Sequence, residues 1–279
     1  MGYVRSMPVV AAVFLLLLAL SAPVAVAQDD NAERFIFDPQ AAIARSQATI
    51  GHRLSDHHFI DQDGRAVRLS DYGGKPLVVS LVFTACAEAC PILIEYLAEA
   101  VEVARETLGA DGFAVVTVGF DAERDRPERL RAFAHGHGID TGSWRFLSGD
   151  PETLDALIEE LGFLRVESPR GFDHLAQTSI LDGERRIFRH VYGADFEAPA
   201  LVDPLKALFF EDVGRLADLS DLIERVRLFC TYYDAKKGRY AFDYSFFISL
   251  AIGSMALLCL AIVLIRAWLR SGKFPGNPA

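Results

Sequence analysis

Two cysteines, Cys86 and Cys90, lie four residues apart, after an apolar segment and directly before Pro91. Proline is favoured at the first position of a helix, so we expect the pair at the junction of a strand and a helix. A loop at this junction would let the two sulfur atoms converge, and the positive end of the helix dipole would stabilise a thiolate at Cys90. Two thiolates that converge can bind a soft metal ion or form a disulfide.

The other two of the four cysteines are not expected to take part in this chemistry. Cys259 lies in a long apolar segment and is predicted to be an inert apolar residue of the span. Cys230 stands alone and is predicted to be packed rather than catalytic. A structural disulfide between Cys86 and Cys90 is the alternative, but closing so short a loop would remove little chain entropy. A functional pair is therefore the preferred interpretation.

The two ends of the chain predict the compartment of these thiols. Arg5 precedes an apolar run at residues 9–20, and small residues precede Gln28, which is typical of a cleaved signal peptide over residues 1–27. An uncleaved anchor is the disfavoured alternative, because the run is shorter than the roughly 20 residues that span a bilayer. Near the other end, residues 244–265 carry no charge and are long enough to span.

This pattern predicts a single-pass membrane protein. We expect a transmembrane helix at residues 244–268 and a cytoplasmic tail at 269–279. Positive charges on the two sides of the span are balanced, so the signal peptide decides that the domain is periplasmic, or exoplasmic. Between the ends we expect an N-terminal extension at 28–54, one soluble domain at 55–212 and a juxtamembrane segment at 213–243. The net charge of −10, with scattered acidic residues, excludes a nucleic-acid surface, which would need a basic cluster.

Strand-like and helix-like segments alternate along the soluble domain. Strands are expected at residues 76–83, 113–120 and 144–147, hairpins over 59–69 and 176–192, and helices at 91–108, from 127, at 151–161 and at 200–210. Asp150 and Pro151 are suited to the start of the third of these helices. The order predicts an α/β protein with a thioredoxin-like fold and an N-terminal β-hairpin, followed by one C-terminal transmembrane helix.

With these elements assigned, the chain resembles the Sco/SenC family of copper-binding, thioredoxin-like proteins of cytochrome c oxidase assembly. The segments that carry the resemblance are residues 59–64, 69–72, 74–76, 83–91, 121–125 and 173–174. By this resemblance Cys86, Cys90 and His174 match the family's copper ligands, and the implied partner is oxidase subunit II or another copper-receiving subunit. The family often has proline where this chain has Ala87 and Ala122, and neither change removes a ligand.

The residue types support a metal without reference to the family. Two thiolates and one imidazole favour Cu(I), and they can hold Cu(II) with a further ligand. Zinc could use the same atoms, but no nearby side chain is placed as the general base of a catalytic zinc site. In thioredoxin-like folds the strand after His174 starts opposite the cysteine loop, where thiol reductases carry a cis-proline. No proline lies between Gly171 and Ala198, which favours a metal site over a general reductase.

The remaining polar candidates are expected to be structural or solvated. Four histidines are predicted to face solvent: His57, His58, His135 and His137. His190 is predicted to be a structural residue of a strand. Asp121 follows an apolar strand and either caps a turn or orients a ligand. Glu88 lies between the two cysteines and either adds negative charge near a bound cation or is simply exposed.

The sequence therefore favours a metallochaperone, a protein that is not an enzyme and that delivers copper to a respiratory oxidase, as the resemblance implies. The alternative is a thiol–disulfide reductase that keeps cysteines of the oxidase or of another partner reduced for metal binding. A peroxidase of the peroxiredoxin type is a third interpretation, and it would need an activated cysteine that this loop does not specify.

Overall fold

The computed structural model describes residues 37–86, 89–169, 171–211, 228 and 230–271. The predicted signal peptide, residues 28–36 of the predicted N-terminal extension, Ala87, Glu88 and the last eight residues of the tail lie outside these residues, as do residues 212–227.

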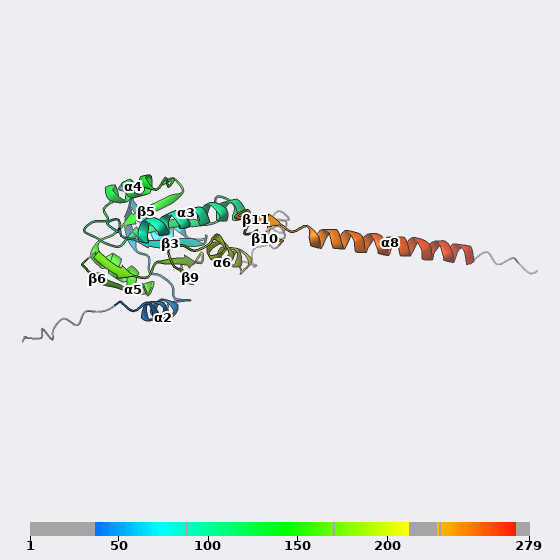
Figure 1. Cartoon of the computed structure of the whole chain (residues 1–279), viewed down its shortest axis with the longest axis horizontal. Coiled ribbons are helices and arrows are strands. Elements are labelled where there is room, and N and C mark those ends of the chain that lie inside the picture. Colours follow the sequence, from blue (N-terminus) through cyan, green and yellow to red (C-terminus); the bar gives the residue numbers. More distant parts are fainter. Residues whose placement is uncertain (1–36, 87–88, 170, 212–227, 229, 272–279) are drawn as a thin grey trace, which may run out of the picture. The chain divides into compact units, whose positions relative to one another are not determined.

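A seven-stranded sheet in the order β2-β1-β5-β4-β3-β8-β9 forms the centre of the described domain (Figure 1). Its strands are β1 (His58–Asp61), β2 (Ala66–Arg68), β3 (Leu77–Val82), β4 (Ala114–Gly119), β5 (Trp144–Ser148), β8 (Gln177–Leu181) and β9 (Ile187–Tyr192). β3, β4 and β5 run parallel, whereas the outer strands pair antiparallel. Every residue of β3 is buried, as expected for a central strand covered on both faces. The two predicted hairpins, β1–β2 and β8–β9, are confirmed.

The helices pack against this sheet through apolar stripes. They are α2 (Pro39–Gln47), α3 (Ala89–Leu108), α4 (Pro127–Gly136), α5 (Pro151–Glu160) and α6 (Ala198–Glu211), with a short 3₁₀ turn, η1 (Leu69–Tyr72). α3 buries Leu93, Leu97, Val101 and Ala104, which lie three or four residues apart on one face. It lies beside α6 (Figure 1). Asp150 caps α5 as predicted, because its carboxylate accepts the Thr153 N–H at 2.8 Å.

Two features of the fold differ from the sequence prediction close to the candidate ligands. α3 begins at Ala89 rather than at Pro91, so Cys90 belongs to the first turn of the helix and not to a loop. His174 ends a strand, β7 (Gly171–His174), which pairs with β6 (Arg165–Ser168) as a separate two-stranded sheet. These strands are only four residues long and only partly buried, so they lack the apolar run that identifies a central strand.

A second unpredicted hairpin lies within the segment that was expected to be a simple juxtamembrane connection. It consists of β10 (Thr231–Asp234) and β11 (Arg239–Phe242). The Tyr240 hydroxyl donates a hydrogen bond to Asp203 of α6, and the Lys206 ammonium lies 5.0 Å from the centre of the Tyr240 ring. The hairpin is therefore packed on the domain through α6.

The last described element, α8 (Ser245–Ser271), matches the predicted span in type and position. Its residues Ser245–Arg270 are long and apolar enough to cross a membrane, and the apolar part is wholly unburied. At a rise of about 1.5 Å per residue, 26 residues extend about 39 Å, which exceeds the roughly 30 Å hydrocarbon core of a bilayer. The helix could therefore span.

A buried polar cluster of the sheet offers a test of how the core is held. The Thr117 hydroxyl lies 2.7 Å from the Ser80 hydroxyl and accepts the Trp144 indole N–H at 2.8 Å. Thr117→Val should lower the free energy of unfolding by about 2 kcal/mol, because it leaves two buried groups without this partner. Ser80→Ala keeps the indole bond and should cost less than about 1 kcal/mol. Urea unfolding in detergent measures both, and equal effects would contradict this account.

Candidate metal centre

The segment after β3 is a tight turn that is held on both sides. The Cys86 N–H donates to the Phe83 carbonyl at 2.9 Å, which closes the turn. The Phe83 N–H points to the Cys90 sulfur at 3.4 Å, and the next N–H, of Thr84, donates to the Asp125 carboxylate at 2.9 Å. Two consecutive backbone amides thus connect the end of β3 to α3 and to the loop after β4.

The two cysteines lie in different environments. Cys90 is buried, with 1% of its surface exposed, and Cys86 is half-buried. Burial raises the pKa of the Cys90 thiol to about 12, and the neighbouring Cys86 thiol and Asp125 carboxylate act in the same direction. The expected thiolate at Cys90 is therefore wrong for this structure. The helix dipole contributes at most about 2 kcal/mol in a partly buried site, and the burial of Cys90 outweighs it.

His174 has the protonation state of a metal ligand. Burial lowers the pKa of its imidazole below the usual value, so the ring is neutral at pH 7. Its Nδ1 lies 3.2 Å from the Leu175 carbonyl, which can only accept, so Nδ1 carries the proton. The lone pair is then on Nε2, where it is available to a metal ion.

A cluster of aromatic rings connects the cysteine turn with His174. The Phe83 ring centre lies 5.4 Å from that of Phe172 and 6.1 Å from that of Phe120, and the Phe120 ring lies 5.3 Å from the His174 imidazole. Gly171 permits this approach, since a Cβ there would lie 2.5 Å from the Phe83 ring. The sequence analysis placed Phe83 and Phe120 at the ends of two predicted strands, but it did not select these aromatic residues as part of the site.

Arg165 fixes the hairpin that carries His174 to this cluster. Its guanidinium lies over the rings of Phe120 and Phe172, and it donates to the Phe120 carbonyl at 2.6 Å and to Asp155 at 2.7 Å. In the β6–β7 pair, Arg165 is the register partner of His174. The sequence gave no signal for this role.

The structure brings the two thiols together but does not complete a three-ligand site. Cys86 is close enough to Cys90 to raise the pKa of the Cys90 thiol. The His174 imidazole packs instead on the rings of Phe120 and Phe163. Among the described residues, no three side chains of His, Cys, Asp or Glu are close enough to hold one metal ion. Coordination by all three predicted ligands therefore needs the His174 hairpin and the cysteine turn to approach each other.

Two aspartates of the loop after β4 have distinct contacts. Asp121 caps its own turn, accepting the Glu123 N–H at 3.1 Å and the Arg124 guanidinium at 2.7 Å. Asp125 is the residue that contacts the cysteine turn, because its carboxylate accepts both the N–H and the hydroxyl of Thr84. Burial raises the pKa of Asp125, and its hydrogen bonds to Thr84 act against that rise. Sequence reasoning considered Asp121 and missed Asp125.

The other histidines differ partly from expectation. His58 and His135 are exposed, as predicted. His57 is not solvated, because its Nε2 lies 2.9 Å from the Glu160 carboxylate and only 10% of its side chain is exposed. His137 is also largely covered, by packing on Phe133. His190 is structural, as predicted: it is buried, and its Nδ1 lies 2.9 Å from the Ser179 hydroxyl.

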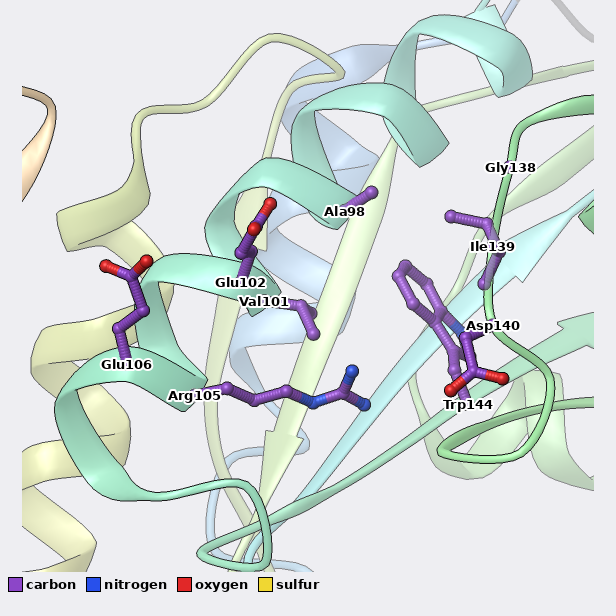
Figure 2. Close-up of a pocket in the computed structure, with 9 residues that line it drawn as sticks. All are labelled: Ala98, Val101, Glu102, Arg105, Glu106, Gly138, Ile139, Asp140 and Trp144. Carbon is purple, nitrogen blue, oxygen red and sulfur yellow. The ribbon is translucent and has the colours of Figure 1, made fainter.

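A cavity of about 490 Å³ lies against the later turns of α3. Figure 2 shows the side chains that line it. It is lined by α3 around Val101 and Arg105, and by the chain from Gly138 to Trp144. Val101 is eleven residues beyond Cys90, which corresponds to about 16 Å along a helix. The cavity is therefore not part of the candidate metal centre.

Comparison with known proteins gives one family. The SCO1/SenC family matches residues 46–209. The SCO1 protein homolog of Bacillus subtilis (strain 168) is 26% identical over 136 residues, which are 47% of this chain and 67% of that protein. A SCO1/SenC family lipoprotein from Bacillus anthracis str. Ames superposes with a TM-score of 0.52 at 23% identity, over 57% of this chain and 95% of that one. ScoI of Arabidopsis thaliana, solved with copper bound, superposes with a TM-score of 0.50 at 20% identity, over 56% of this chain and 98% of that one. The predicted thioredoxin-like α/β fold is confirmed.

The different environments of the two thiols predict different rates of alkylation. With a pKa of about 12, only about one Cys90 side chain in ten thousand is a thiolate at pH 8. With Cys230 and Cys259 replaced by serine, a variant that keeps only Cys86 should therefore react with iodoacetamide at least about tenfold faster than one that keeps only Cys90. Mass spectrometry of quenched samples measures both rates. Equal rates in the folded protein, with urea-unfolded samples as the control, would show that Cys90 is not shielded.

Proposed function

Because the chain belongs to the SCO1/SenC family, we propose that it is a membrane-anchored copper metallochaperone for the copper centre of a respiratory cytochrome c oxidase. The observation that carries the proposal is the pair of adjacent thiols, Cys86 and Cys90, joined through an aromatic cluster to the neutral imidazole of His174. Copper is the cargo of this site, and the proposed recipient is subunit II of the oxidase or another copper-receiving subunit.

The donor set suits copper in the cuprous state. Cu(I) prefers thiolate and imidazole ligands in a low coordination number, and two sulfurs with one nitrogen supply them. His174 can bind without losing a proton, whereas Cys90 must release one when a metal binds. The cost of that release disfavours weakly binding cations and is offset by a soft ion that binds thiolate strongly.

We propose that the anchor is α8 and that the domain faces the periplasm, or the exoplasmic side. The supports are the apolar length of Ser245–Arg270 and the signal-like pattern of residues 1–27. The proposed organisation is a signal peptide at 1–27, an extension at 28–54, the copper-binding domain at 55–212 and a juxtamembrane segment at 213–243. The span and a short cytoplasmic tail follow.

A thiol–disulfide reductase is the second candidate, and one observation favours it. Among the described residues the two thiols lie together without a third ligand beside them. In this reaction the Cys86 thiolate attacks a partner disulfide, and one partner sulfur leaves as a thiol. Cys90 then attacks the Cys86 sulfur, and a second partner thiol is released with a Cys86–Cys90 disulfide on this protein. Two electrons and two protons pass to the partner, and the buried Cys90 suits the resolving step.

Ligand substitutions distinguish the two functions. Cys86→Ser and Cys90→Ser should each abolish tight Cu(I) binding and disulfide formation, since both need the pair. His174→Ala should weaken Cu(I) binding by at least about 10-fold, because losing a ligand should cost no less than losing a residue that only orients one, and it should leave the disulfide able to form. Competition with a chromophoric Cu(I) chelator measures affinity, and His135→Ala, at an exposed histidine, is the control.

The same variants decide between the functions in cells grown with limiting copper. All three substitutions should lower the copper content of the oxidase if copper delivery dominates, whereas only the cysteine changes should do so if thiol reduction dominates. If His174→Ala binds Cu(I) as tightly as the unmodified protein, the ligand assignment is wrong and the reductase becomes the preferred function.

The orientation is tested with reporters at two sequence positions. A reporter fused after Lys273 should be active only if cytoplasmic, and a tag placed after Gln28 should be accessible only from outside. We expect the reporter to be active and the tag to be accessible from outside, because the sequence pattern indicates a translocated domain followed by one span. A mature protein that keeps Met1, or a tail that external protease removes, would contradict the orientation.

A further inference from the structure

The carboxylate of Asp125 makes three hydrogen bonds in a buried position beside the cysteine turn. Its Oδ1 accepts the Thr84 N–H at 2.9 Å and the Thr84 hydroxyl at 2.6 Å. Its Oδ2 accepts the Asp121 N–H at 2.9 Å. The residue is 1% exposed, so water does not compete for these bonds.

The position of this carboxylate is fixed by the end of β4. The Asp125 N–H donates to the Asp121 carbonyl at 2.8 Å, which folds the loop back on the strand. The Asp125 side chain then lies directly over Gly119, where an added Cβ would be 2.4 Å from the Asp125 Cβ. The loop thus presents its carboxylate to Thr84 from a rigid support.

Thr84 connects the fixed Asp125 carboxylate to the cysteine turn. It follows Phe83, whose N–H points to the Cys90 sulfur, and it lies inside the turn closed by the Cys86 N–H and the Phe83 carbonyl. Holding Thr84 by both its amide and its hydroxyl therefore fixes the direction in which the chain leaves β3 and the place where it presents Cys86.

We propose that Asp125 is the positioning residue of the cysteine pair: through Thr84 it holds Cys86 within reach of Cys90. It thereby sets both the affinity of the pair for a soft metal ion and the equilibrium of the pair with its disulfide. This inference rests on the proposed function only in taking Cys86 and Cys90 as the reacting pair.

The redox equilibrium is measured with glutathione as the co-reactant. Glutathione disulfide takes two electrons and two protons from the thiols of Cys86 and Cys90, so that one protein disulfide and two glutathione thiols form. The equilibrium constant of this exchange depends on how well the fold holds the two sulfurs together, and not on the overall stability of the domain.

Asp125→Asn and Thr84→Val are the test variants. The first replaces one acceptor oxygen by a donor, and the second removes only the hydroxyl. Thr84→Ser keeps the hydroxyl and is the rescue variant. Thr153→Val is the matched control, because Thr153 also gives its N–H and hydroxyl to one aspartate, Asp150, on a helix without cysteines.

The full-length protein in detergent is equilibrated with glutathione buffers, and Cu(I) affinity is measured by competition with a chromophoric chelator. Asp125→Asn and Thr84→Val should each lower the glutathione equilibrium constant and the Cu(I) affinity by about tenfold. Thr84→Ser and Thr153→Val should stay within about twofold of the unmodified protein. If Asp125→Asn fails to fold, Thr84→Val alone decides.

The inference is overturned if the test variants lose thermal stability while both constants match those of Thr153→Val, since Asp125 would then be purely structural. Failure of the proposed function gives a different result. An unmodified protein that binds no Cu(I) would reject the metallochaperone, and the glutathione constants of the same variants would still support or overturn the positioning role.

Discussion

The backbone pairing of β3 with β4 at their carboxyl ends positions the candidate metal centre. Val82 is the register partner of Gly119, and the Phe120 N–H donates to the Val82 carbonyl at 3.0 Å. The segments that follow β3 and β4 therefore leave the sheet side by side. The first is the cysteine turn and the second is the loop with Asp125. The carboxyl edge of a parallel sheet is where side chains from separate segments converge. Here they converge beyond the buried ends of β3 and β4.

Burial at this edge has a chemical consequence as well as a structural one. The same packing that places Cys90 against the end of β3 keeps its thiol protonated, whereas Cys86 stays partly accessible. In either proposed function an incoming metal ion or disulfide would therefore meet Cys86 first, and Cys90 would react second. This order suits both proposed functions, because stepwise capture of a metal and resolution of a mixed disulfide each use one accessible and one shielded sulfur.

The sequence predicted the parts of this arrangement that depend on local pattern. β3 and β4 are apolar except for Ser80 and Thr117, and α5 starts with a capping aspartate and a proline. The cysteine spacing predicted that the two thiols lie together. The β6–β7 hairpin could not be predicted in the same way, because its support comes from contacts of Arg165 with Phe120 and Asp155. Such contacts join residues far apart in the sequence.

Asp125 shows the same limit at the level of one side chain. The segment 121–125 begins and ends with aspartate, and composition does not say which carboxylate contacts the cysteine turn. The fold decides it, because Gly119 leaves space for Asp125 over β4 and Asp121 is used to cap the turn. The expectation of a thiolate at Cys90 was wrong for a related reason. Cys90 is buried by the packing of the whole domain, which the sequence around Cys90 does not reveal.

The connection toward α8 is the least predictable part of the described chain, and it bears on how α8 would act as the proposed anchor. Only Asp243 and Tyr244 separate β11 from α8, and the Asp243 N–H donates to the Cys230 carbonyl at 2.7 Å. The Asp243 carboxylate also accepts the Ser245 N–H at 2.8 Å, which caps the start of α8. Since β11 is itself held to α6 through Tyr240, the chain reaches the candidate span from a packed hairpin and not from a long flexible linker. With α8 as the proposed anchor, a connection of two residues would limit how far the domain moves from the membrane, and the proposed partner would have to bring its copper-receiving or disulfide-bearing loop to the cysteine turn.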